Sequence, residues 1–251
     1  MTISIDELEQ AAAPGWRAAE EDRLGDWLLR AASGFSGRAN SALAVGDPGR
    51  PPREAIDAVR TWYSARGLPA MIAVPYPTGR PGNSALDRLL AGLGWTIRAD
   101  AATVMTAAPT EVAARAGRGH VAVDLESEPD QAWLARYHYR GQELPKVAVE
   151  LLTSAPWQAF AAVRSDGDTI AIGRVAGSGE WAGLTAIEVA MQHRRRGLGG
   201  TVTGALAASA VARGATGLYL QVADDNHAAR ALYRQLGFAD HHGYHYRIAP
   251  D

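Results

Sequence analysis

The stretch LYLQVADDNHAARALYRQLGF, residues 218–238, decides how the second half of this chain folds. Its first residues, Leu218–Val222, form a short apolar run that predicts a buried strand. Asp225 can cap a helix that follows, and Gly237 can end it. Within that helix the apolar residues recur at the spacing of one helical face: Ala229, Leu232, Tyr233 and Leu236. The sequence therefore predicts a strand and an amphipathic helix in direct succession.

A second informative stretch, RRRGLGG at Arg194–Gly200, stands between a strand predicted over Trp181–Val189 and a helix predicted over Val202–Arg213. Glycines in such a turn let backbone N–H groups approach an anion, and the helix N-terminus and the arginines add positive charge. A pyrophosphate suits this environment. Alone, the turn is equally compatible with a solvated arginine-rich loop, and it matches neither a P-loop nor a dinucleotide fingerprint.

The remaining pattern of the second half predicts a central sheet flanked by helices. Alternating apolar runs at Gln158–Val163 and Thr169–Val175 are joined by a polar turn, which indicates a β-hairpin. His242–Ile248 predicts a final strand. Helices are predicted over Gln131–Arg140 and about Val147–Leu152. This half is therefore expected to be an α+β domain.

The first half repeats part of this order. Strands are predicted over Leu28–Ala32, Ala39–Val45 and Ala70–Val74, and a helix is predicted after Pro51 and Pro52. A second helix matches the one in the opening stretch, because residues 83–95 and 226–238 share Asn, Ala, two Leu and Gly in register, and each ends on an aromatic residue. Such repetition predicts two similar α+β domains in tandem, each with a mixed central sheet flanked by helices. Ala107–Gly119 is small and polar, which predicts a linker between them.

Together, the glycine loop and the pattern Asn226…Ala229…Leu232-Tyr233…Leu236-Gly237-Phe238 resemble the GNAT superfamily of acyl-CoA N-acyltransferases. The resemblance covers about residues 119–251. It implies an active N-acetyltransferase domain there and a degenerate GNAT-like domain over residues 1–108. It also implies acetyl-CoA as cosubstrate and direct attack of a primary amine on the thioester.

The resemblance assigns roles by position. Backbone groups of Ile187 and Val189 would face the acetyl and pantetheine parts of the cosubstrate, Asn226 would hydrogen-bond the pantetheine arm, and Tyr233 would protonate the leaving thiolate. A core tyrosine is the alternative for Tyr233. The pyrophosphate would be bound by backbone N–H groups of the loop residues Arg194, Arg195, Arg196, Gly197, Leu198 and Gly199.

The general base is less well marked. Several GNAT protein acetyltransferases have Glu where this chain has Gln221, and an amide cannot accept a proton from the amine. Glu188, on the preceding predicted strand, is the candidate replacement. A solvent-facing strand residue is the equal alternative for Glu188, and deprotonation through ordered water stays open.

Other polar clusters carry weaker signals. His241, His242 and His245 alternate along a strand and do not converge simply, so no metal site is expected, although one histidine could line the acceptor pocket. Either core packing or the acceptor site can explain the cluster Trp133, Tyr137, His138 and Tyr139. The run Arg38-Ala-Asn-Ser41 matches no motif.

The first half lacks the features of the active site. Its corresponding loop, Gly46–Pro52, contains prolines that remove N–H donors and an aspartate that repels phosphate. Leu90 stands where Tyr233 stands in the second half. Only the second domain is therefore expected to bind acetyl-CoA.

Composition narrows the partners. The chain has no cysteine and a net charge of −2, which excludes disulfides and a cysteine nucleophile and gives no sign of a nucleic-acid partner. Neither a signal peptide nor a membrane-spanning run is evident, so we expect a cytoplasmic monomer or homodimer. Gln221 favours a small-molecule amine as acceptor. A protein or peptide acetyltransferase and a non-catalytic acyl-CoA-binding sensor are the alternatives.

Overall fold

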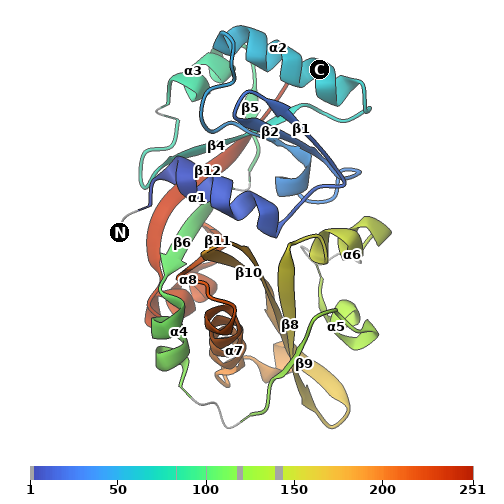
Figure 1. Cartoon of the computed structure of the whole chain (residues 1–251), viewed down its shortest axis with the longest axis vertical. Coiled ribbons are helices and arrows are strands. Elements are labelled where there is room, and N and C mark those ends of the chain that lie inside the picture. Colours follow the sequence, from blue (N-terminus) through green and yellow to red (C-terminus); the bar gives the residue numbers. More distant parts are fainter. Residues whose placement is uncertain (1–2, 83, 100, 118–120, 139–143, 251) are drawn as a thin grey trace.

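One mixed sheet runs through the whole protein in the computed structural model, which describes residues 3–250 except 83, 100, 118–120 and 139–143 (Figure 1). The described strands are β1 (Glu20–Leu24), β2 (Trp27–Ala31), β3 (Ala42–Leu43), β4 (Met71–Pro77), β5 (Thr96–Ile97), β6 (Ala102–Ala107), β7 (Asp124–Glu126), β8 (Trp157–Ser165), β9 (Asp168–Ser178), β10 (Trp181–Val189), β11 (Gly217–Ala223) and β12 (Ala239–Ile248). The helices are α1 (Ile5–Ala12), α2 (Pro52–Ser64), α3 (Ala85–Gly92), α4 (Pro109–Ala116), α5 (Gln131–Arg136), α6 (Lys146–Leu152), α7 (Leu198–Ala212) and α8 (His227–Gln235).

The two halves follow the same local order. In the first, β1, β2 and β3 are antiparallel neighbours, and β4 pairs parallel with β3 after the crossover helix α2. In the second, β8, β9 and β10 are antiparallel neighbours, and β11 pairs parallel with β10 after the crossover helix α7. A further helix follows in each half, α3 in the first and α8 in the second.

The last strand of each half pairs with a strand of the other half. β6, which comes from the first half, pairs antiparallel with β11, and β12, from the second half, pairs antiparallel with β4. β6 and β12 also pair with each other and so join the halves, as the green and red strands between the upper and lower parts of Figure 1 show. We expected one central sheet in each half. Instead, 12 strands form one continuous sheet.

The expected linker at Ala107–Gly119 is wrong, because α4 occupies most of it. Pro109 starts this helix, where a missing N–H costs nothing. α4 packs closely against α7, since a Cβ at Gly204 would lie only 2.4 Å from Ala116 Cβ. The connection between the halves is thus part of the second core.

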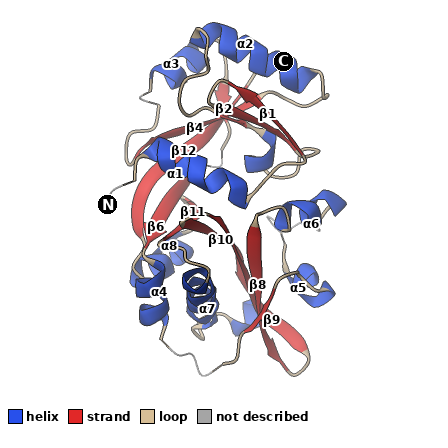
Figure 2. Ribbon diagram, viewed as in Figure 1, coloured by secondary structure: helices blue, strands red, loops and turns tan. Residues whose placement is uncertain are grey.

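Helices cover both faces of the lower part of the sheet (Figure 2). α4 and α7 pack on one face against Ala161 and Val163, and α5 and α6 pack on the other against Phe160 and Ala162. This alternation follows from the two-residue period of a strand. On the upper part, α2 and α3 cover one face, and Leu90 is fully buried there.

Buried polar contacts tie the halves together. Arg174, in the middle of β9, donates to the carbonyls of Leu152 and of Gly15 in the first half, and burial lowers its pKa to about 10. Asp87 on α3 accepts from Arg247 at 2.7 Å and contacts His245 at 2.9 Å. Burial alone would raise the pKa of Asp87, but the hydrogen bonds from these two partners outweigh it and hold that pKa below its usual value.

The three C-terminal histidines contact different partners. His241 bonds to the Ile3 carbonyl and to His242, His242 Nε2 lies 2.8 Å from Glu9 Oε1, and His245 contacts Asp87. Within the described residues no group of His, Cys, Asp or Glu is arranged to hold a metal ion.

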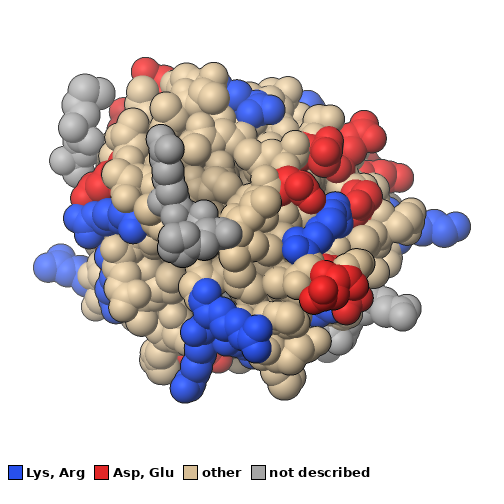
Figure 3. All heavy atoms as spheres, turned by 90° about the horizontal axis from the view of Figure 1, so that it is seen from below, with Lys and Arg blue, Asp and Glu red and all other residues tan. Residues whose placement is uncertain are grey.

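Surface charge is mixed. On the face seen from below, one basic group stands by itself, while other basic side chains lie directly beside acidic ones (Figure 3). No helix among the described residues has the length and apolar character needed to cross a membrane.

Candidate active site

The site begins where β10 and β11 separate. These parallel strands pair only over Trp181–Leu184, opposite Gly217–Leu220. Beyond that point β10 stays on β9 through a bulge between Thr185 and Glu188, where Ala186 takes a left-handed φ of 55°. The bulge turns the end of β10 away from β11. Backbone groups of β10 between the bulge and its end are therefore left without a β11 partner, facing the gap.

The glycine-rich loop closes the lower end of this gap. Arg195 has a φ of 60°, and Gly197, the N-cap of α7, has a φ of 79°. No side chain caps α7. The first backbone N–H groups of this 15-residue helix therefore have no side-chain acceptor, and they lie at the positive end of the helix dipole. The loop thus produces a helix start whose backbone N–H groups are available to a ligand.

The opposite wall is the start of α8. Asn226, rather than the expected Asp225, caps this helix, because its Oδ1 accepts from Ala229 N at 3.2 Å. α7 and α8 approach closely here, and a Cβ at Gly199 would lie 3.1 Å from Leu232 Cδ2. Glycine at position 199 is what allows this approach.

Between β10, the loop and α8 lies a cavity of about 1010 Å³. All but one of the expected site residues line it: Ile187, Glu188, Val189, Arg194, Arg195, Gly197, Leu198, Gly199, Asn226 and Tyr233. The exception is Arg196, which is exposed and outside the lining.

Tyr233 stands at the inner end of this cavity. Its ring packs edge-on against Phe238, with centroids 5.7 Å apart, and only 8% of the residue is exposed. Among the described residues its hydroxyl has no hydrogen-bond partner, although the residue lines two adjoining cavities. Burial raises the pKa of Tyr233 to about 12, so the phenol keeps its proton at neutral pH.

Glu188 faces the same space from β10. Its carboxylate accepts from the backbone N–H of His138 at 3.1 Å and lies 3.5 Å from that residue's Nδ1. The side chain is about a quarter exposed (26%), which leaves it accessible from the cavity. Glu188 is thus a carboxylate held by a backbone hydrogen bond, and it lines the same cavities as Tyr233.

A second cavity of about 430 Å³ continues from Tyr233 and Glu188 toward the first half. Tyr137 and His138 line it, as part of the aromatic cluster noted in the sequence, whereas its neighbour Tyr139 lies outside the described residues. The helix predicted over Gln131–Arg140 ends at Arg136, so both residues follow it. His241, His242 and His245 are not among the residues that line these cavities, so the possibility that one of them reaches the acceptor pocket gains no support.

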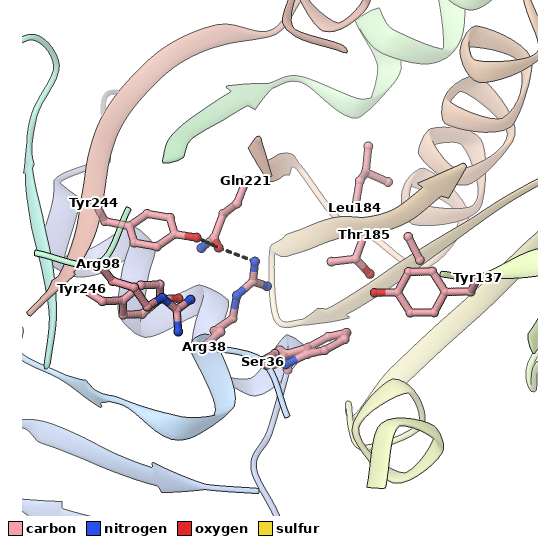
Figure 4. A pocket seen from close by; sticks show the side chains of 12 residues that line it. Ser36, Arg38, Arg98, Tyr137, Leu184, Thr185, Gln221, Tyr244 and Tyr246 are labelled. Atoms are coloured by element: carbon pink, nitrogen blue, oxygen red, sulfur yellow. Dashed lines mark hydrogen bonds between the residues drawn. The ribbon is translucent and has the colours of Figure 1, made fainter. Parts of the chain in front are cut away.

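The cleft ends in a third cavity of about 190 Å³ between the halves (Figure 4). Here Gln221 Oε1 accepts from Arg38 and, at 2.8 Å, from Tyr244 Oη. Arg38 had no interpretable motif in the sequence. No local signal could identify it, because it reaches the site only through the joining of the halves.

Comparisons with known proteins agree on one family. The family described as "Probable histone acetyltransferase Rv0428c C-terminal" matches residues 2–247. The uncharacterized N-acetyltransferase YobR of Bacillus subtilis is 29% identical over 254 residues, covering 97% of this chain and 98% of that protein. The probable histone acetyltransferase Rv0428c of Mycobacterium tuberculosis is 30% identical over 253 residues, covering 99% of this chain and 74% of that protein.

A solved structure agrees in fold. The GCN5-related N-acetyltransferase from Kribbella flavida superimposes with a TM-score of 0.71 at 18% identity, covering 98% of this chain and 95% of the other. The likeness extends over both halves of the chain.

Proposed function

Since this chain belongs to the GNAT acetyltransferase family, we propose that it transfers the acetyl group of acetyl-CoA to the primary amine of a small molecule. N-acetyl transfer is the activity of the family. The single observation that carries the finer proposal is one cleft that joins a pyrophosphate-type loop, an unpaired strand edge, a buried phenol and a carboxylate.

The donor end of the cleft fits acetyl-CoA. Backbone N–H groups from Gly197 to Gly199 would bind the pyrophosphate, with Arg194 and Arg195 adding charge. The exposed Arg196, which does not line the cavity, would attract the pyrophosphate only through its charge at long range. The unpaired edge of β10 near Ile187 and Val189 offers backbone groups to the pantetheine and the thioester carbonyl. The bound cosubstrate supplies an activated acyl group.

Two side chains would handle the protons. Glu188, held by His138, accepts a proton from the attacking amine. Tyr233 donates to the sulfur as negative charge develops there, and its raised pKa keeps it protonated for this role. Asn226 keeps its amide N–H groups for the pantetheine arm, since its oxygen already caps α8.

We assign the donor site to residues 119–251 and regard residues 1–108 as a degenerate copy. The repeated order of strands and helices supports this division. In the first half the loop after β3 is held against the β1–β2 turn, since Asp47 N donates to the Asp26 carboxylate and Asp26 N donates to the Asp47 carbonyl. Leu90 is buried core at the position that corresponds to Tyr233.

The test is acceptor-dependent release of free thiol from acetyl-CoA with a panel of amines. We expect turnover with wild type, and for Tyr233→Phe a fall in kcat of roughly 100-fold or more, the usual contribution of a general acid. Acetyl-CoA affinity measured by calorimetry should stay within a factor of about 3, because the lost hydroxyl makes no bond in the protein.

Tight acetyl-CoA binding without thiol release for any amine would refute the enzyme proposal and favour an acyl-CoA sensor. Mass spectrometry of the products identifies the acceptor atom and the acyl chain. Preferential acetylation of a lysine peptide over every small amine would refute the small-molecule acceptor.

A further inference from the structure

We propose that the acceptor amine carries a second, anionic group, a carboxylate or a phosphate, that the Arg38 guanidinium binds at the junction of the two halves. This inference rests on the proposed function and names the class of acceptor.

Arg38 is a partly buried cation held at the end of the cleft. It follows a loop of the first half and extends between the two walls of the third cavity (Figure 4). Its protein contacts are the neutral amide of Gln221 and the ring of Trp16, whose centroid lies 5.7 Å from the guanidinium carbon. Within the described part of the chain, no carboxylate lies within ion-pair distance of Arg38.

Among the described residues, the charged side chains that line this cavity are arginines. The described residues lining this cavity include a second arginine, Arg98, which stacks on Tyr246 at 4.6 Å, and no aspartate or glutamate. Hydroxyl groups of Ser36 and Thr185 also line it. Glu9 and Arg38 line a small adjoining cavity, and the Glu9 carboxylate, which contacts His242, is one of the groups that raise the pKa of Arg38.

Gln221 keeps this charge available. A glutamate at position 221 would form an ion pair with Arg38, whereas the neutral amide accepts a hydrogen bond from Arg38 without adding a negative charge. A guanidinium binds planar carboxylates and phosphates through two parallel hydrogen bonds, so an anion of the ligand is the group that fits.

One small molecule can reach both ends of the acceptor space. Arg38, Glu188 and Tyr233 all line the second cavity, whose volume is about 430 Å³. An amine placed at Glu188 and an anion placed at Arg38 therefore belong to a compact molecule of amino-acid or amino-phosphate type. A lysine- and arginine-rich peptide would bring further cations against Arg38 and Arg98.

The test uses the full chain and matched amines: 4-aminobutanoate with its amide, and 2-aminoethyl phosphate with 2-aminoethanol. Binding is measured by calorimetry with saturating CoA, which fills the pyrophosphate loop and prevents turnover. We expect the member that carries the carboxylate or phosphate to bind at least about tenfold more tightly than its partner without that group, as for a charge-assisted hydrogen bond, and the pair that responds distinguishes carboxylate from phosphate.

Two variants assign this preference to Arg38. Arg38→Gln and Gln221→Glu should each abolish it and leave CoA affinity within about threefold, while Arg38→Lys should retain part of it. Gln221→Glu keeps the arginine in place, so a loss in that variant cannot come from misfolding of the Arg38 loop. Thermal unfolding of each variant provides the folding control.

The proposal would be overturned if the two members of each pair bound with equal affinity. It would also be overturned if Arg38→Gln weakened the binding of both members equally. Because the assay needs no turnover, it stands apart from the enzyme proposal. Anion-dependent binding without thiol release would refute acetyl transfer and leave the anion site intact.

Discussion

Replacing Asn40 with alanine should release the loop that carries Arg38. Asn40 is buried, and its side chain holds this loop from both sides. Its Oδ1 accepts from the N–H groups of Ala32 and Gly34 at 2.8 and 2.9 Å, and its Nδ2 donates to the carbonyls of Phe35 and Ser36 at 2.7 and 2.9 Å. No other side chain of the protein is described with so many bonds to one loop.

The size of the effect follows from these contacts. Four hydrogen bonds, two buried and two partly buried, at about 1 kcal/mol each give a loss of about 4 kcal/mol. The loop also contains Ser33 and Ser36 with φ values of 49° and 61°. If the loop is released, each of these two residues can leave the left-handed conformation, which offsets the loss by about 1 kcal/mol per residue. The net expectation is a fall of about 2 to 4 kcal/mol in the free energy of unfolding.

Urea denaturation of the two proteins, followed by circular dichroism, measures this difference. Ser33→Gly in the same loop is the control, and it should leave stability unchanged or raise it slightly, since glycine adopts a positive φ without strain. The acceptor KM should also rise in Asn40→Ala while the Kd for acetyl-CoA stays constant. A loss below about 1 kcal/mol would refute the reasoning, because the four bonds would then contribute almost nothing.

Three further outcomes are expected. Gly199→Val should weaken CoA binding at least about tenfold in calorimetry, because even a Cβ there lies 3.1 Å from Leu232, and an affinity within threefold of wild type would contradict this. The free energy of unfolding should fall as pH rises from 10 to 12, by up to about 2.7 kcal/mol each for Tyr63 and Tyr233. Both have folded pKa values of about 12, so the unfolded chain loses these protons first. In urea titrations Tyr233→Phe should make this fall shallower, and an unchanged slope would count against the burial of the phenol. Asp87→Asn should lower the free energy of unfolding by about 3 kcal/mol or more, because it leaves the buried Arg247 guanidinium without its carboxylate partner and removes the carboxylate that contacts His245. An unchanged midpoint of thermal unfolding would refute this.

Much of the local structure was predictable from the sequence. The strand predicted over Trp181–Val189 has the observed bounds, and the helices α2 and α3 lie where their apolar spacing predicts. These segments have periods and caps that depend on neighbouring residues alone. The glycine loop and its helix were found for the same reason.

The shared sheet was not predictable in this way. β6 is short and made largely of small residues, and its partner β11 lies more than a hundred residues later. Nothing within residues 102–107 specifies that pairing, and the small and polar residues of α4 are equally typical of a linker. Arg38 was missed as a site residue for the same reason, since its role depends on contacts between distant segments.

The exchange of β6 and β12 has a consequence for how the chain reaches this structure during synthesis. The sheet of the first half is complete only when β12 pairs with β4, and β12 is made of residues 239–248. Residues 1–108 therefore leave the ribosome with the edge of β4 unpaired and must wait while the rest of the chain is translated. A fragment cut between the halves would expose that edge and one face of its core, and we expect it to aggregate rather than fold alone.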